Sequence, residues 1–143
     1  MEQCRENKAA IVTGASSGIG AAISARLCEM GYEVFGIGRS FGSSFAEQFP
    51  DAAGNPLFHA VVCDLLDTEK MLKMVREIAA EAEVTLLVNN AGVAGQALFQ
   101  DVTDEMWHRY FSTNVDGAYH TIQAVLPAML HAHEGCIINI SSI

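Results

Sequence analysis

Basic residues are scarce in this sequence, which holds eight Lys and Arg against 17 Asp and Glu, for a formal net charge of −9. This balance argues against nucleic acid or an anionic membrane as the main partner, because both attract positive surfaces. A phosphate group can still be bound, since it needs local backbone donors and not a positive net charge. No apolar run approaches the roughly 18–20 residues that span a bilayer. The polar start of the chain is unlike a secretory signal, so we expect a cytoplasmic protein without a membrane partner.

Paired cysteines are also missing. The four cysteines are scattered, and no two of them have the C-x-x-C spacing of a metal or redox site. We expect reduced thiols, with Cys28, Cys63 and Cys136 packed in apolar segments. The histidines are isolated, apart from His131 and His133, which are two positions apart on an expected helix and therefore face different ways. The sequence predicts no metal site.

Short apolar runs alternate with amphipathic stretches along the chain. Half of the 143 residues are hydrophobic, which suits one globular domain with its own core. The runs predict strands over residues 9–12, 32–38, 57–63, 84–88 and 136–140. Strands joined by helices form a parallel sheet covered on both faces, which is the doubly wound, Rossmann-like α/β architecture. Its ligand lies beyond the carboxyl ends of the strands, where the strand order reverses.

Helical periodicity fills most of the segments between these runs. A first helix should end at Gly31, and its apolar face holds Ile19, Ile23, Leu27 and Met30. A short helix is expected over residues 42–49, ended by Pro50. Thr68 is the expected cap of the next helix, whose apolar face holds Met71, Leu72, Val75, Ile78, Ala79 and Ala82.

Two further helices are expected before the last strand. One starts at Thr103-Asp104-Glu105-Met106, which has the composition of a helix N-terminus. A long helix follows, and its apolar side holds Val115, Ala118, Ile122, Val125, Leu126 and Met129. Pro127 interrupts this pattern, so we expect a kink or a local break there.

A glycine-rich motif lies between the first strand and the first helix. It reads Thr-Gly-Ala-Ser-Ser-Gly-Ile-Gly, from Thr13 to Gly20. A pyrophosphate needs backbone N–H donors at the positive end of a helix, with no side chain in the way. Gly14 would allow the tight turn, Gly18 would let the backbone approach the ligand, and Gly20 would let the helix pack on the strand. The alternative is an ordinary loop with a helix cap.

A second motif, Asn89-Asn90-Ala91-Gly92, ends the fourth strand. Two adjacent Asn residues directly after the apolar run Leu86-Leu87-Val88 are unusual. Their amides can hydrogen-bond backbone across the sheet ends, or a sugar. The alternative is a simple turn, because Asn and Gly both favour turns.

Four motifs in chain order carry a resemblance to a known family. They are Thr-Gly-x-x-x-Gly-Ile-Gly from Thr13, Asn-Asn-Ala-Gly from Asn89, Asn-Val-Asp-Gly from Asn114, and Asn-Ile-Ser-Ser from Asn139. In this order they resemble the short-chain dehydrogenase/reductase family over essentially the whole chain. The resemblance implies one NAD(P)-binding, Rossmann-like domain over residues 1–143, with strand order 3-2-1-4-5. Strands 6 and 7 of the family would be missing, so we expect a C-terminally incomplete domain.

The resemblance also implies which positions meet the coenzyme. The phosphates and ribose would be lined by the glycine motif, from which we take Gly14, Ser16, Ser17, Gly18, Ile19 and Gly20. Asp64 and Leu65 would flank the adenine, with the Asp64 carboxylate accepting from its exocyclic amine. The nicotinamide-side ribose would meet Asn90, Ala91 and Gly92.

Two positions resemble the catalytic residues of the family. Asn114 matches the Asn that holds a water on the proton relay, and Ser142 matches the catalytic Ser that hydrogen-bonds the substrate oxygen. Taken without the resemblance, Asn114 could be a helix cap, and Ser141 or Ser142 could form a strand-end turn.

The end of the second strand bears on the choice of coenzyme. An acid there usually reads a 2′-hydroxyl, whereas a 2′-phosphate requires Arg or Lys and no carboxylate. Gly38 stands where NAD-specific members have an acid, Arg39 follows it, and the next acid is Glu47. NADP(H) is therefore favoured over NAD(H). Some NADP-dependent members also have a basic residue in the glycine motif, where this chain has Ser17. The alternative for Arg39 is a solvated surface residue.

The family's Tyr-x-x-x-Lys pair is absent from these 143 residues. The residues four positions after Tyr32, Tyr110 and Tyr119 are Gly, Asn and Gln. In the family a Tyr moves the substrate proton and the Lys lowers its pKa, so we expect the chain alone to be inactive. It could represent part of a longer enzyme, a truncated product, or a natural binding module. Strand 136–140 would then be an apolar sheet edge.

The resemblance therefore predicts an NADP(H)-dependent oxidoreductase that acts on a small carbonyl or alcohol substrate. The long helix normally contributes to a dimer face in this family, so a full-length protein is expected to form a homo-oligomer. The alternative is a non-catalytic nucleotide-binding or interaction module derived from the family.

Overall fold

A five-stranded parallel sheet forms the centre of the computed structural model, which describes residues 8–142. The strands are β1 (Ala9–Thr13), β2 (Glu33–Gly38), β3 (Phe58–Val62), β4 (Val84–Asn89) and β5 (Cys136–Asn139). They lie in the order β3-β2-β1-β4-β5, with every neighbouring pair parallel. This confirms the predicted α/β class and strand order, including β5 at one edge.

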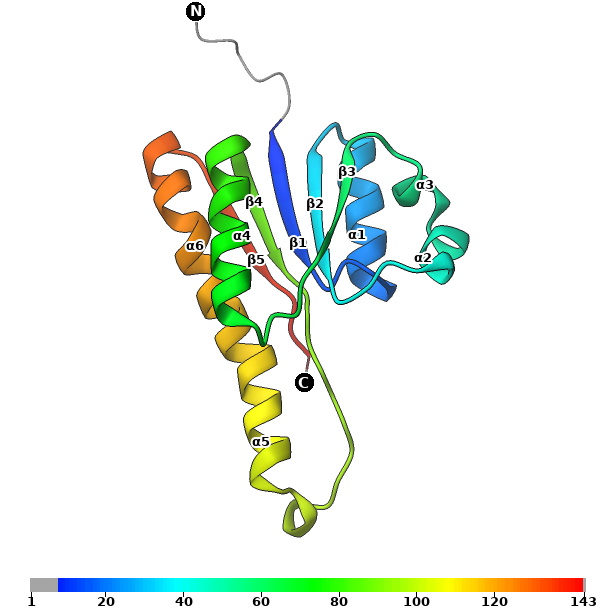
Figure 1. Ribbon diagram of the computed structural model, residues 1–143, viewed down its shortest axis with the longest axis vertical. Helices are drawn as coiled ribbons and strands as arrows, with labels where there is room; N and C mark the ends of the chain where they lie inside the picture. Colours follow the sequence, from blue (N-terminus) through cyan, green and yellow to red (C-terminus); the bar gives the residue numbers. More distant parts are fainter. Residues whose placement is uncertain (1–7, 143) are drawn as a thin grey trace, which may run out of the picture.

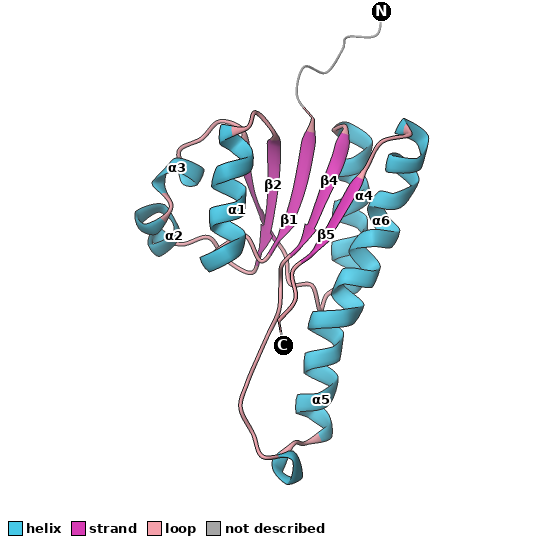
Figure 2. Cartoon of the chain, turned by 180° about the vertical axis from the view of Figure 1, so that it is seen from behind, coloured by secondary structure: helices cyan, strands magenta, loops and turns pink. Residues whose placement is uncertain are grey.

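Helices lie on both faces of the sheet (Figures 1 and 2). One face carries α1 (Gly18–Glu29), which contacts the short α3 (Pro50–Ala53), and α3 in turn contacts α2 (Ser43–Gln48). The other face carries α4 (Thr68–Glu81) and α6 (Gly117–Ala132), which pack against each other. Two further helices, α5 (Asp104–Phe111) and the one-turn η1 (Phe99–Asp101), extend past the carboxyl ends of the strands (Figure 1).

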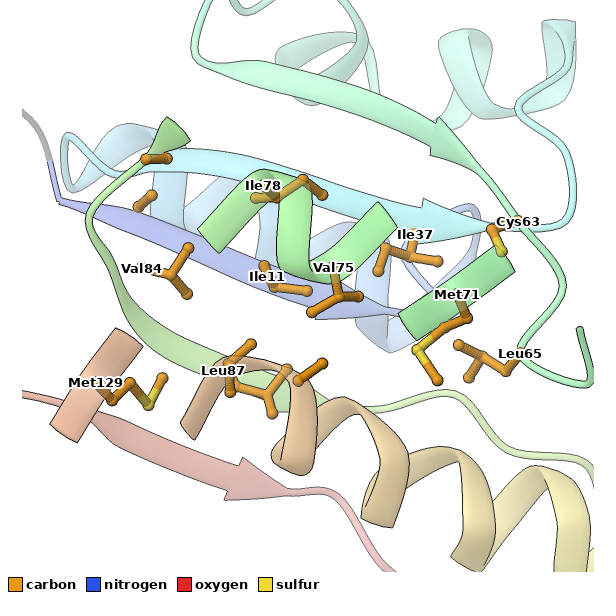
Figure 3. Close-up of a cluster of buried hydrophobic side chains, with 14 residues drawn as sticks. Ile11, Ile37, Cys63, Leu65, Met71, Val75, Ile78, Val84, Leu87 and Met129 are labelled. Atoms are coloured by element: carbon orange, nitrogen blue, oxygen red, sulfur yellow. The ribbon is translucent and has the colours of Figure 1, made fainter. Parts of the chain in front are cut away.

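The main core lies between the sheet and the α4–α6 layer. Figure 3 shows Met71, Val75 and Ile78 of α4 gathered over Ile11 of β1 and Leu87 of β4. Four of these five side chains are fully buried, and Ile78 retains 8% exposure. Because burying one such side chain contributes about 1.5–3 kcal/mol, this layer holds α4 firmly over the strands whose ends form the site.

One predicted helix cap is corrected, and one predicted helix end is followed by an unexpected helix. Thr68 is not the cap of α4, because Asp67 occupies the cap position and its carboxylate accepts from the Lys70 backbone N–H at 3.3 Å. The helix over Ser43–Gln48 ends before Pro50 as predicted, but Pro50 also begins α3. Pro suits that first helical position, where its missing N–H has no helical partner to lose.

The predicted apolar side of the long helix is wrong in part. Val115 and Leu126 are 52% and 39% exposed. A π-helical turn, η2 (Ser112–Asp116), precedes α6 and shifts the register of its faces. As a result, the residues of α6 that face the core are Gly117, Thr121, Ala124, Val125 and Met129. The expected break at Pro127 is absent, since α6 runs through it to Ala132.

The prediction that Cys136 is packed in an apolar segment is wrong. Cys28 and Cys63 are buried as expected, but Cys136 is exposed because β5 is the edge of the sheet. Cys4 lies outside the described residues. Burial raises the pKa of the Cys28 and Cys63 thiols above its ordinary value. The unfolded chain therefore ionises these thiols first, and the free energy of unfolding falls as the pH rises past the ordinary thiol pKa.

We expect iodoacetamide at pH 8 to modify Cys136 at least about tenfold faster than Cys28 or Cys63, because the two buried thiols are both inaccessible and protonated. Peptide mass spectrometry after timed quenching measures the three rates. The same reaction in denaturant is the control, in which the rates should become equal. Equal rates in the folded chain would contradict the placement of β5 at the edge.

Candidate functional site

A hollow of about 340 Å³ opens at the carboxyl ends of the strands. Segments that follow β1, β2, β3 and β4 all contribute to its wall, and the strand order reverses between β1 and β4. This is where doubly wound sheets bind ligands. All residues predicted for the coenzyme line the hollow except Gly20, namely Gly14, Ser16, Ser17, Gly18, Ile19, Arg39, Asp64, Leu65, Asn90, Ala91 and Gly92.

The glycine loop turns sharply out of β1 and into α1. Gly14 and Gly18 have φ values of +67° and +51°, a region that side chains rarely adopt. A Cβ on Gly20 would lie 2.2 Å from the Gly14 carbonyl oxygen, so Gly20 does not face the hollow but lets α1 start against the loop. Ser17 makes no side-chain cap hydrogen bond at the start of α1. The first-turn N–H groups of α1 therefore remain available to an anion.

Asn90 ties the end of β4 to the glycine loop. Its side-chain Nδ2 donates to the carbonyl oxygens of Thr13 at 3.1 Å and Gly14 at 3.3 Å. The hydroxyl of Thr13 in turn accepts from the backbone N–H groups of Asn90 and Ala91, at 3.1 and 3.0 Å. Of the predicted alternatives for Asn90, the bonds to backbone across the sheet ends are therefore present. The structural role of Thr13 was missed, although its place at the end of β1 is a local signal.

A partly buried polar network holds the last strand beside β4. Asn89 is 7% exposed, and its Nδ2 donates to Oδ1 of Asn139 at 3.0 Å. Its Oδ1 accepts from the hydroxyl of Thr121 on α6 at 2.7 Å. The Ile140 N–H then donates to the Asn89 carbonyl oxygen at 2.9 Å. These bonds place the segment that carries Ser142, which is exposed and does not line the hollow.

Asn114 lies within the π-helical turn and clamps the segment after β4. Its Oδ1 accepts from the Val93 N–H and its Nδ2 donates to the Val93 carbonyl oxygen, both at 2.8 Å. Its side chain therefore does not act as a helix cap. Single π-turns are frequent at functional sites because they rotate one side chain out of the helical register. The side chain of Asn114 does not itself line the hollow, but Val93 does.

The segment after β3 forms another wall. The Asp64 Oδ1 accepts from the Leu66 N–H at 3.0 Å, which closes a tight turn. Leu65 is buried, and a Cβ on Gly117 would contact it at 3.5 Å, so the start of α6 packs directly on this wall. Burial raises the pKa of the neighbouring Cys63 thiol. Lys70 lowers this pKa more weakly, and the nearby carboxylates of Asp67 and Asp64 raise it slightly further. Asp64 supplies the one carboxylate that residues 8–142 place on the lining.

Arg39 lies on the lining directly after β2. Its neighbour Gly38 packs against the loop, because a Cβ there would lie 2.9 Å from the Ser16 Cβ. The side chain of Arg39 is exposed and makes no ion pair within the described part of the chain. A guanidinium at this point suits a phosphate.

The sequence missed two residues that approach the hollow from α5 and η2. Arg109 and Thr113 line it four positions apart, although neither follows a strand end. Val93 and Leu66 were missed as well. The spacing of Arg109 and Thr113 is a helical signal, but only the path of α5 past the carboxyl ends of the strands shows that these two residues face the hollow.

Residues 8–142 show neither a candidate membrane span nor a candidate metal-binding cluster. Within that range no helix is both long and apolar enough to cross a membrane. The described residues also contain no group of three His, Cys, Asp or Glu side chains placed to hold a metal ion.

A doubly wound parallel sheet whose glycine loop opens into a hollow at the strand-order reversal defines a nucleotide-binding α/β domain. Residues 8–143 match the short chain dehydrogenase family, and the chain belongs to that family. Members of this family that resemble the chain are oxidoreductases.

Individual relatives support this assignment. The 3-oxoacyl-(acyl-carrier-protein) reductase FabG of Chlamydia muridarum is 36% identical over 140 residues, which are 96% of this chain and 56% of that protein. The chain thus spans about half the length of the curated relatives that it matches. A crystal structure described as an NAD(P)-dependent gluconate 5-dehydrogenase of Beutenbergia cavernae, with bound NADP, has a TM-score of 0.85 at 36% identity. The match covers 95% of this chain and 54% of that protein.

A second solved structure is a variant of the actinorhodin polyketide ketoreductase with NADPH. It has a TM-score of 0.83 at 31% identity, with 95% of this chain and 53% of that chain covered. Both structures were solved with a 2′-phosphorylated coenzyme.

Proposed function

We propose that this chain forms the coenzyme-binding part of an NADP(H)-dependent oxidoreductase that interconverts a small carbonyl and an alcohol. The observation that carries the proposal is the hollow at the strand-order reversal, with Arg39 on its lining directly after β2 and no acid in the sequence from Arg39 up to Glu47. The nicotinamide coenzyme would supply the hydride chemistry. The NADP or NADPH in the similar structures supports the same choice.

The residues of the hollow fit such a coenzyme. The uncapped start of α1 and the backbone of Gly14 and Gly18 suit the pyrophosphate. Arg39 suits the 2′-phosphate, and Asp64 suits an exocyclic amine, because a carboxylate accepts hydrogen bonds and repels phosphates. The wall formed by Ala91 would lie along the ribose on the nicotinamide side.

The substrate side of the proposal rests on Ser142 and Asn114. Ser142 would hydrogen-bond the substrate oxygen, and Asn114 would hold a water of the proton relay. The family's Tyr and Lys are not among these 143 residues, so we propose that the chain by itself binds the coenzyme without turning it over. The cytoplasmic location and the homo-oligomer of a full-length protein stay predictions.

Titration of the chain with NADPH and NADH, followed by coenzyme fluorescence, tests the proposal. Arg39→Ala should raise the Kd for NADPH about tenfold or more and leave the Kd for NADH unchanged, because only NADPH carries the phosphate. Arg76→Ala, on the exposed side of α4, is the matched control and should change neither. Equal losses for the two coenzymes would contradict the preference for NADP(H), and a wild-type chain that binds neither would refute the proposal.

The second candidate is a module of the same family that binds nucleotide without catalysis. A protein that continues past residue 143 and contains the Tyr-x-x-x-Lys pair separates the two. Oxidation of NADPH in the presence of small ketones or aldehydes supports the enzyme. Tight NADPH binding without oxidation supports the module.

A further inference from the structure

We propose that Arg109 closes the adenine end of the coenzyme hollow, with its guanidinium against the adenine base and not against a phosphate. This inference rests on the proposed function, because it assigns a residue to the same coenzyme site. It differs from the assignment of Arg39, which concerns the 2′-phosphate.

The path of the helices puts Arg109 beside the wall that follows β3. Arg109 is in the last turn of α5, and Thr113 follows it in the π-helical turn; both line the hollow. One turn further on, Gly117 packs against the Leu65 side chain. The same helical stretch therefore runs past Leu65 and brings Arg109 to the wall formed by the segment after β3.

The chemistry of that wall suits a base and not a phosphate. It contains the Asp64 carboxylate, which would repel a phosphate but can accept from an amino group. Leu65 and Leu66 add an apolar surface of the kind on which a flat ring packs. The features that suit phosphates lie elsewhere on the lining, at the start of α1 and at Arg39.

The guanidinium of Arg109 is available for this contact. Glu105 is one turn earlier on α5, but the two side chains form no ion pair, nor does Arg109 form any other in the described part of the chain. A planar guanidinium stacks on aromatic rings and also donates to ring nitrogens. Among the described residues, the charged ones on the lining are Arg39, Asp64 and Arg109, so Arg109 is the cation left for the base once Arg39 has the phosphate.

The inference is tested in the full chain with three ligands, two of which each lack one chemical group of the first. They are NADPH, NADH, which lacks the 2′-phosphate, and reduced nicotinamide mononucleotide, which lacks the adenosine. Arg109→Ala should raise the Kd of NADPH and NADH equally, by about tenfold, and leave the Kd of the mononucleotide unchanged. Arg109→Lys should restore little, because an ammonium keeps the charge but not the planar group.

Other outcomes overturn the inference. A loss confined to NADPH and rescued by Arg109→Lys would show that Arg109 binds the 2′-phosphate, and Arg39→Ala supplies the reference for that pattern. No change for either dinucleotide would show that Arg109 does not touch the coenzyme. Arg76→Ala is again the control for loss of a surface cation. A wild-type chain that binds no dinucleotide would refute the proposed function together with this inference, whereas normal wild-type binding with an unaltered variant refutes only the inference.

A measurement on the unmutated chain gives an independent check. In a spectrum of the arginine side-chain N–H groups, adenosine 5′-monophosphate should shift the Arg109 resonance, and ribose 5-phosphate at the same concentration should not. A shift with both ligands would mean that the phosphate alone reaches Arg109. No shift with either would contradict the contact.

Discussion

Replacing Gly20 with alanine is expected to weaken coenzyme binding strongly and to destabilise the fold. A Cβ at this position would lie 2.2 Å from the Gly14 carbonyl oxygen and 2.5 Å from the Asn90 Nδ2. Neither neighbour can yield cheaply, because the first is backbone and the second is bonded to the Thr13 and Gly14 carbonyl oxygens. We expect the free energy of unfolding to fall by about 2–3 kcal/mol and the Kd for NADPH to rise at least about 30-fold. Urea denaturation and fluorescence titration measure these two quantities.

Alanine variants of two other glycines distinguish the effect of a steric clash from the effect of backbone strain. Gly18 and Gly31 have φ values of +51° and +88°, and a Cβ on either would meet no atom within 4 Å. Alanine should therefore cost about 1 kcal/mol of stability at each position. Only Gly18 lines the hollow, so only Gly18→Ala should also weaken NADPH binding. If Gly20→Ala behaved like Gly31→Ala, the close packing of α1 on the glycine loop would be refuted.

Replacing Asn114 with alanine is expected to release the segment after β4. The variant loses both 2.8 Å hydrogen bonds to the backbone of Val93. Each such bond contributes about 0.5–1.5 kcal/mol, so the free energy of local opening should fall by about 1–2 kcal/mol. This corresponds to amide hydrogen exchange at Val93 that is roughly 5–30 times faster. Because Val93 lines the hollow, the Kd for NADPH should rise as well.

Two companion variants define the reason for that effect. Asn114→Asp keeps an acceptor for the Val93 N–H but places a second oxygen, which cannot donate, against the Val93 carbonyl oxygen. It should therefore restore less than half of the protection of the Val93 amide from hydrogen exchange. Asn55→Ala removes a comparable side-chain bond, to the Leu57 N–H at 2.9 Å, in a loop before β3. It should leave exchange at Val93 unchanged. Wild-type exchange in Asn114→Ala would show that the clamp does not hold the segment in solution.

Local signals account for the parts of the site that the sequence predicted. The glycine motif, the Asn pair and Asp64 each come directly after an apolar run, and the carboxyl ends of parallel strands meet at one edge of a sheet. Eleven of the twelve residues predicted for the coenzyme line the hollow. Their roles toward a ligand stay predictions. The exception, Gly20, supports the loop from beneath, which is also a close-packing role for a glycine.

Contacts between distant segments account for what was missed. Asp67, and not Thr68, caps α4, because its carboxylate accepts from the Lys70 N–H. Composition alone cannot distinguish between two adjacent residues that can both cap a helix. The faces of α6 shifted because a π-helical turn precedes it, and that turn has no clear sequence signature. Cys136 is exposed because its apolar run lies at the sheet edge, while the similar run of β4 lies inside the sheet.

The sequence by itself determined the α/β class, the strand order and the edge of the sheet at which a nucleotide would bind. The class and the binding edge follow from periodicity and from motifs that are contiguous in the chain, and the strand order follows from the resemblance of those motifs to a known family. Only the tertiary structure decided that Asn90 braces the glycine loop, that Asn114 holds Val93, and that Arg109 faces the hollow. Each of those facts depends on the relative positions of elements separated by many residues, and packing, which no local pattern encodes, sets those positions.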